Sequence, residues 1–146
     1  MLARMSGWLG RYSIGILRVS LGTVFFVFGA LKFVPGMSPA QDLVVRTLET
    51  LSLGMVPGTA ALIITAVAEC FIGVTLITGR FLRVGLAVLG ASLVGIMSPL
   101  VLFFTDLVGH GVTLEAQYVF KDIVLVAGGL VVAAKALGSS PVNTRR

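Results

Sequence analysis

Four apolar runs, each about as long as a membrane-crossing helix, constrain the fold of this chain more than any other feature. They cover residues 13–33, 56–78, 84–105 and 118–137. A helix needs ~20 apolar residues to cross a hydrocarbon core of ~30 Å. Backbone amides in lipid must be hydrogen-bonded within the protein, which leaves helices or closed barrels, and these continuous runs lack the alternation of barrel strands. We therefore predict an all-α integral membrane protein, a four-helix bundle that forms one domain over residues 1–137.

Two segments outside these runs have the pattern of amphipathic helices. Residues 1–12 place apolar side chains at helical spacing beside Trp8, which predicts an N-terminal interfacial helix, with a frayed terminus as the alternative. Residues 39–53 follow a Ser38-Pro39 pattern typical of a helix start. They predict an outer amphipathic helix between spans 1 and 2, either a simple connector or a cover over the mouth of the bundle. Residues 138–146 are expected to form a short polar tail.

The positions of lysine and arginine predict the orientation. Seven of them precede the first run, join the second to the third, or follow the fourth: Arg4, Arg11, Arg80, Arg83, Lys135, Arg145 and Arg146. The other two connections hold only Arg46 among clear loop cations. Because cytoplasmic loops carry the excess of Lys and Arg, we expect a multi-pass protein with both termini in the cytoplasm.

Five charged side chains lie within the apolar runs or at their edges: Arg18, Lys32, Glu69, Lys121 and Asp122. A charge at the centre of a membrane helix costs about 2.5–3.5 kcal/mol on insertion scales, so such residues normally face the bundle interior and pair there. We take these five residues as the candidate functional polar pocket.

Depths counted along the runs suggest how these charges pair. At ~1.5 Å per residue, Arg18 lies roughly 7 Å and Glu69 roughly 13 Å from the cytoplasmic ends of their runs. An arginine side chain spans that difference, which predicts an inner Arg18–Glu69 pair and an outer triad of Lys32, Lys121 and Asp122. The triad would carry surplus positive charge suited to an acceptor-rich ligand. The alternative is structural, with buried ion pairs that set the helix register.

Small residues and one proline predict where the helices meet. Gly22 and Gly29 share one face of the first run, and Gly73 shares a face with Glu69, which favours close helix contacts. Gly128-Gly129 predicts a further contact on the fourth run. Pro99 should kink the third helix or free the carbonyl of the residue four positions earlier.

Several functions are disfavoured by the residues available. Cys70 is the single cysteine and His110 the single histidine, which argues against disulfide exchange and excludes bis-histidine haem ligation by this chain. We expect His110 to be a solvated loop residue and no metal site. No catalytic constellation is legible, which favours a non-catalytic or accessory subunit. The net charge of +5 is spread without a basic, aromatic-interleaved stripe, so we expect no nucleic-acid partner.

Three ordered motifs resemble those of the DoxX-like family of small bacterial inner-membrane proteins, in particular its YkgB-type branch. Residues 28–33 (FGALKF) resemble the end of that family's first helix, Ala68-Glu69 before Gly73 its acidic second helix, and residues 120–125 (FKDIVL) the start of its fourth. The resemblance implies a four-helix protein of the bacterial inner membrane, linked to oxidative stress and to membrane oxidoreductase complexes. It carries over Lys32, Glu69, Lys121 and Asp122, with Arg18 as an addition.

The sequence and the resemblance together give one leading functional hypothesis and two alternatives. The first is a small membrane subunit of a redox or oxidative-stress-defence assembly, whose pocket contacts a quinone or lipid headgroup. The second is a small-molecule or ion transporter with Glu69 as a protonatable switch. The third is a structural partner or assembly factor for another membrane protein. The expected partners are the lipid bilayer and a membrane or oxidoreductase protein, with a homo-oligomer also open.

Overall fold

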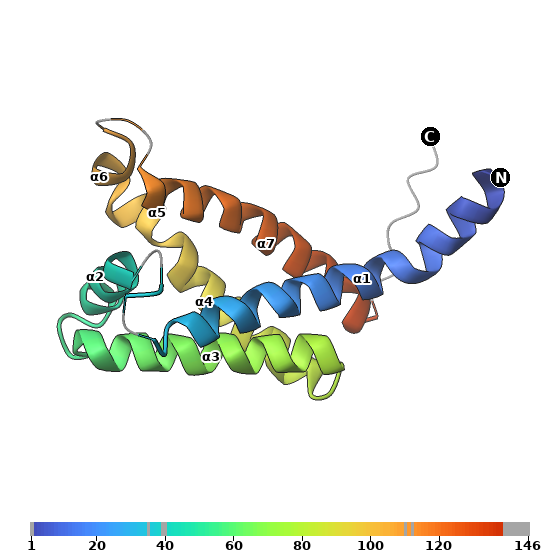
Figure 1. Cartoon of the computed structure of the whole chain (residues 1–146), viewed down its shortest axis with the longest axis horizontal. Coiled ribbons are helices and arrows are strands. Elements are labelled where there is room, and N and C mark those ends of the chain that lie inside the picture. Colours follow the sequence, from blue (N-terminus) through green and yellow to red (C-terminus); the bar gives the residue numbers. More distant parts are fainter. Residues whose placement is uncertain (1, 35, 39–40, 110, 112, 139–146) are drawn as a thin grey trace.

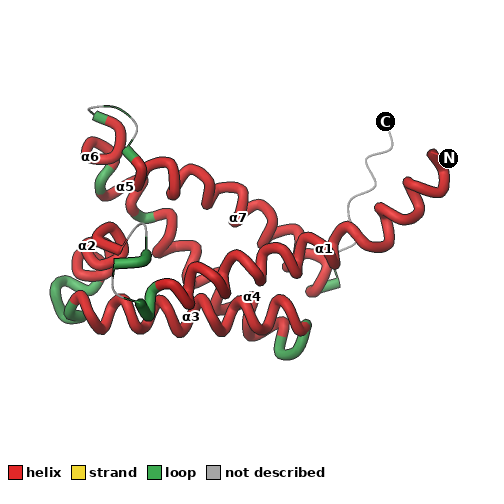
Figure 2. Tube along the Cα trace, in the orientation of Figure 1, coloured by secondary structure: helices red, strands yellow, loops and turns green. Residues whose placement is uncertain are grey.

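The computed structural model describes residues 2–34, 36–38, 41–109, 111 and 113–138. Its regular structure is helical, and the described residues contain no strand (Figure 2), which confirms the all-α prediction. The helices are α1 (Leu2–Leu31), α2 (Gln41–Leu51), α3 (Gly58–Thr78), α4 (Leu82–Met97), α5 (Pro99–Leu102), α6 (Phe104–Val108) and α7 (Leu114–Ala136).

Three segments are long and apolar enough to cross a membrane. They are Met5–Leu31 in α1, Gly58–Thr78 in α3, and Leu82–Leu102, which joins α4 to α5. Large apolar side chains such as Val67 and Val94 point outward from them, as expected of surfaces that contact lipid. The fourth predicted run forms α7, which has 23 residues and packs against α1 and α4. It carries Lys121 and Asp122 and is not among the three apolar segments.

The predicted N-terminal interfacial helix is not a separate element. From Leu2 onward the chain forms one continuous helix of 30 residues, about 45 Å long at the usual rise. Figure 1 shows the first turns of α1 extending beyond the other helices. The prediction of a distinct helix was wrong because no glycine-proline break or cap separates residues 1–12 from the apolar run that follows.

Glycines allow α1 and α3 to pack closely along their length, and these two helices lie side by side (Figure 1). A β-carbon on Gly73 would lie 2.6 Å from Phe26 Cβ, and one on Gly22 would lie 2.9 Å from the carbonyl oxygen of Gly73. A β-carbon on Gly29 would lie 2.9 Å from the backbone nitrogen of Cys70. Only glycine fits at these three positions, which confirms the predicted close contact.

Pro99 divides the third apolar run. Helix α4 ends at Met97 and α5 begins at Pro99. Proline has no N–H to donate to the carbonyl of Gly95, and the Ser98 hydroxyl donates to that carbonyl instead, at 2.7 Å. The predicted interruption is therefore present, and Pro99 itself is buried. Beyond Leu102 the chain turns into the short helix α6.

Two apolar clusters hold the helices together. One joins α1, α3, α4 and α7 through Leu21, Phe25, Ile72, Leu76, Leu89 and Val132. Gly128 and Gly129 of α7 sit there against leucines of α1 and α4, as predicted. The other cluster joins α2, α6 and α7 through Leu43, Leu107, Ala116 and Val119. The space between the clusters, at the end covered by α2, holds the candidate site.

Candidate functional site

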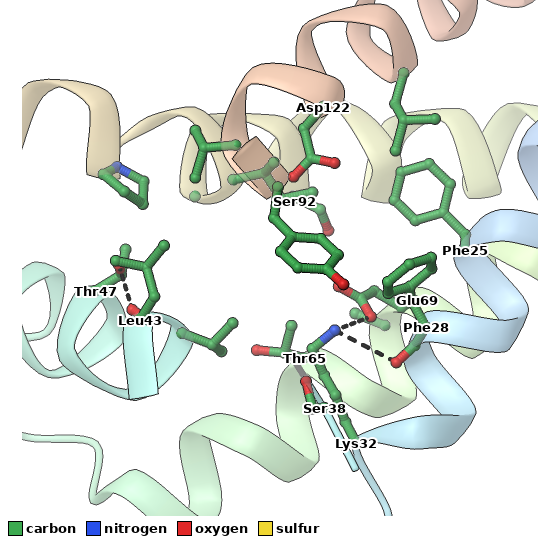
Figure 3. Close-up of a pocket in the computed structure, with 18 of the residues that line it drawn as sticks. Phe25, Phe28, Lys32, Ser38, Leu43, Thr47, Thr65, Glu69, Ser92 and Asp122 are labelled. Carbon is green, nitrogen blue, oxygen red and sulfur yellow. Dashed lines mark hydrogen bonds and ion pairs between the residues drawn. The ribbon is translucent and has the colours of Figure 1, made fainter. Parts of the chain in front are cut away.

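A cavity of ≈ 470 Å³ lies between the helices at the end of the molecule that α2 covers. This volume is within the range typical of small-molecule pockets, about 300–1,000 Å³. Most of the wall is apolar. The polar lining residues are Lys32, Ser38, Thr47, Thr65, Glu69, Ser92, Tyr118, Lys121 and Asp122. Figure 3 shows Lys32, Glu69 and Asp122 facing this space from three different segments of the chain.

A buried ion pair lies at one side of the cavity. Lys32 follows the last residue of α1, and its Nζ lies 2.6 Å from Glu69 Oε2 of α3 (Figure 3). The two side chains are 6% and 9% exposed. Lys32 Nζ also donates to the carbonyl oxygen of Phe28 at 3.4 Å, one turn earlier in α1. The pair joins the two helices that pack most closely, and each charge is neutralised by the other.

The second lysine of the cavity is held differently. Lys121 Nζ lies 3.9 Å from the centre of the Phe28 ring and 4.5 Å from that of Tyr118. Its distance to Asp122 Oδ1 is 4.0 Å, which is too long for a hydrogen bond. The Lys121 side chain is 40% exposed. The aromatic rings stabilise its ammonium group by cation–π attraction while leaving its three N–H donors available to another group.

The predicted Arg18–Glu69 pair is wrong, and the helix register explains why. In the antiparallel α1–α3 contact, Gly29 meets Cys70 and Gly22 meets Ile77, so Arg18 lies beside Gly79. Gly79 is ten residues from Glu69, about 15 Å along a helix. Counting depths from the ends of the two apolar runs assumed that both runs start in one plane. In the structure Glu69 instead forms its ion pair with Lys32, and Arg18 lies outside the cavity.

The division into an inner pair and an outer triad is therefore also wrong. Lys32, Glu69, Lys121 and Asp122 line one cavity, with two cations and two acids that balance formally. The cavity as a whole therefore lacks the surplus positive charge that the predicted triad would have had. The two lysines nevertheless differ in their surroundings. Lys32 is neutralised by the close carboxylate of Glu69, whereas Lys121 has no carboxylate within hydrogen-bond distance.

Helix α2 covers one side of the cavity. Leu43 and Thr47 of α2 are buried and line it, opposite the ion pair (Figure 3). Arg46, on the other face of α2, binds Asp106 of α6 at 2.9 Å and lies 4.7 Å from the ring of Phe103. The structure thus contains a helix in the predicted segment, at Gln41–Leu51. Of the two roles predicted for it, the structure supports a cover over the cavity rather than a simple connector.

Sequence reasoning missed the aromatic residues of the site. Phe28 lies four residues before Lys32, and Tyr118 lies three residues before Lys121, so each shares a helix face with a lysine. That spacing was the available signal. The hydroxyl-bearing residues Thr47, Thr65 and Ser92 carried no such signal, because they lie in three helices whose relative register the sequence does not specify.

Two predictions concern metals and loops. The described residues contain no cluster of three or more metal-ligating side chains, and His110 lies outside the described residues.

Residues 13–106 match the family model of DoxX. That match includes Lys32 and Glu69 and ends before Lys121 and Asp122. No curated protein and no solved structure matches the chain.

Proposed function

Because the chain belongs to the DoxX family, we propose that it is a small membrane subunit of a redox or oxidative-stress-defence assembly whose cavity holds a quinone-like headgroup. The family as a whole is loosely associated with oxidative-stress and redox functions. Membership of the YkgB-type branch is part of the proposal. The observation that carries it is the free ammonium group of Lys121 at the edge of an apolar cavity inside a membrane protein.

A quinone ring matches the chemistry of this cavity. The ring is flat and apolar, and its two carbonyl oxygens accept hydrogen bonds without carrying charge. Apolar walls and the Phe28 and Tyr118 rings would pack against such a ring. The N–H groups of Lys121 would donate to one carbonyl. Lys32 is less suited, since Glu69 already takes its closest hydrogen bond.

Loss of the ligand on removal of Lys121 is the first test. A hydrogen bond to a charged group contributes about 1.5–3 kcal/mol, so Lys121→Met should lower quinone retention about tenfold or more. The protein should still fold, because this side chain is partly exposed and its carboxylate is distant. The measurement is native mass spectrometry of the detergent-extracted protein, with bound quinone quantified after extraction.

A bulky side chain that fills the cavity should also abolish quinone retention. Ser92 lines the cavity (Figure 3), so Ser92→Trp should exclude the ligand while Ser92→Ala retains it. Full retention by Lys121→Met and Ser92→Trp would contradict binding in this cavity. Flux of a solute into liposomes that depends on Glu69 would favour the transporter. Co-purification of a protein partner with an empty cavity would favour the assembly factor.

The proposal includes a four-span bundle with both termini in the cytoplasm of a bacterial inner membrane. Helix α7 is not among the three segments found apolar enough to span a membrane, so labelling of its two ends tests the fourth span. Leu114 and Leu137 lie at opposite ends of α7 and are exposed. In a Cys70→Ser background, Leu114→Cys should react with a membrane-impermeant maleimide from the periplasmic side, and Leu137→Cys only after the membrane is permeabilised. Reaction of both from the same side would contradict the four-span arrangement.

A further inference from the structure

Charges are separated along the length of the molecule. All six acidic residues belong to the half that contains the cavity and α2: Asp42, Glu49, Glu69, Asp106, Glu115 and Asp122. Among the described residues the opposite end carries cations and no acidic residue; its cations include Arg11, Arg18, Arg80, Arg83 and Lys135. Positive charge at this end therefore has no acidic side chain close by to balance it.

Arg18 is the cation that this separation affects most. Its Nε is buried and has no hydrogen-bond partner, and no ion pair among the described residues includes it. Its guanidinium group lies against Gly79, where a β-carbon would be 2.6 Å from one terminal nitrogen. Gly79 has φ of 72°, so glycine is favoured there on two grounds, its backbone conformation and the space that Arg18 occupies.

Two features indicate that the Arg18 guanidinium lies near a membrane surface. Gly79 directly follows the last residue of the candidate span Gly58–Thr78. Arg80 comes next and is exposed. Trp8 and Tyr12 are exposed, with ring centres 5.6 Å apart, as is usual for aromatic residues at the membrane interface. They lie six to ten residues, roughly 9–15 Å, further toward the N-terminus of α1, so Arg18 lies on the bilayer side of them.

We propose that Arg18, together with Arg80, binds the phosphate of an anionic phospholipid. A guanidinium group matches phosphate oxygens in a bidentate geometry and supplies charge-assisted hydrogen bonds. Basic pockets between membrane helices on the cytoplasmic side are known to bind acidic headgroups. The lipid phosphate would accept from Arg18 Nε or its terminal nitrogens and balance the charge that the protein leaves unpaired.

The surroundings favour a lipid over free phosphate. Ile77 and Phe81 lie two residues before and after Gly79, and both are exposed apolar side chains. An acyl chain would lie against them while the headgroup contacts the arginines. This site lies at the opposite end of the bundle from the cavity, with the Leu21–Ile72–Leu76 cluster between them, so it does not depend on the proposed quinone site.

Lipid retention measured on matched variants tests the proposal. The full chain would be reconstituted with equal amounts of phosphatidylglycerol and phosphatidylcholine, extracted in mild detergent, and analysed by native mass spectrometry. We expect the wild type to retain phosphatidylglycerol in preference to phosphatidylcholine. Arg18→Gln should reduce that retention about tenfold, and Arg18→Lys should reduce it less because the charge remains. Arg11→Gln is the control and should stay within about twofold of the wild type, since Arg11 is exposed on α1.

A comparison with inorganic phosphate distinguishes a phospholipid headgroup from free phosphate as the ligand of Arg18. Short-chain phosphatidylglycerol should raise the melting temperature of the wild type, and inorganic phosphate at the same concentration should not. Equal stabilisation by inorganic phosphate would overturn the lipid assignment. Equal retention of both lipids by the wild type would overturn it as well, without any need for the variants to fold. Unchanged phosphatidylglycerol retention in Arg18→Gln would remove Arg18 from the site.

Discussion

Replacing Lys32 by methionine should destabilise the protein more than neutralising any other cation of the cavity. Lys32 and Glu69 are 2.6 Å apart and almost fully buried. Lys32→Met leaves the Glu69 carboxylate inside the bundle without its counter-charge. Loss of one partner of a buried pair costs about 3–5 kcal/mol in soluble proteins. We expect a loss of that order in the free energy of unfolding, measured by denaturation in detergent micelles.

A double-mutant cycle shows whether the loss belongs to the pair. Apolar residues of similar volume often replace a buried ion pair without loss of stability. Lys32→Met combined with Glu69→Met should therefore recover much of the stability that either single change removes. The matched control is the exposed pair Arg46–Asp106, whose side chains are 51% and 61% exposed. Arg46→Met should cost no more than about 1 kcal/mol. Additive losses in the cycle would show that Lys32 and Glu69 do not interact.

The sequence identified the charged residues of the cavity but not their pairing. Lys32, Glu69, Lys121 and Asp122 stood out because charges are rare in apolar runs, and all four line the cavity. Which charges meet depends on the register of α1 against α3, which is determined by the contacts of Gly22, Gly29 and Gly73. A displacement of one helical turn, about 5.4 Å, would change which charges pair. The ends of an apolar run do not define the depth of a residue to within one turn.

The sequence predicted helix α2 but left its position over the cavity open, and it did not predict the continuity of α1. The period of residues 39–53 predicted α2 because amphipathic spacing is local. Its position over the cavity depends on contacts between residues far apart in the chain, such as Arg46 with Asp106 of α6. The continuous N-terminal helix was missed because a change from amphipathic to fully apolar sequence is no helix stop. A helix boundary needs a residue that breaks the backbone pattern or caps it.

Replacing Gly73 by alanine should be the most damaging single-methyl change on α3. The new β-carbon would lie 2.6 Å from Phe26 Cβ, 2.7 Å from Phe26 N and 2.8 Å from the carbonyl oxygen of Gly22. The last two of these atoms are backbone, so a side-chain rotation cannot relieve the contact and α1 must move away from α3. Overpacking of this kind typically costs 1–3 kcal/mol, and sometimes more.

The same displacement should also weaken the ion pair that lies one turn away. Glu69 precedes Gly73 by four residues on the same face of α3, and Lys32 reaches it from α1. Separating these helices lengthens the Lys32–Glu69 contact, so part of the loss in Gly73→Ala should disappear when Lys32→Met and Glu69→Met are already present. Gly90→Ala in α4 is the control. Its β-carbon would meet no atom within 4 Å, and alanine is favoured over glycine in a helix by about 0.5–1 kcal/mol. Equal melting temperatures for the two alanine variants would contradict the close α1–α3 contact on which the cavity depends.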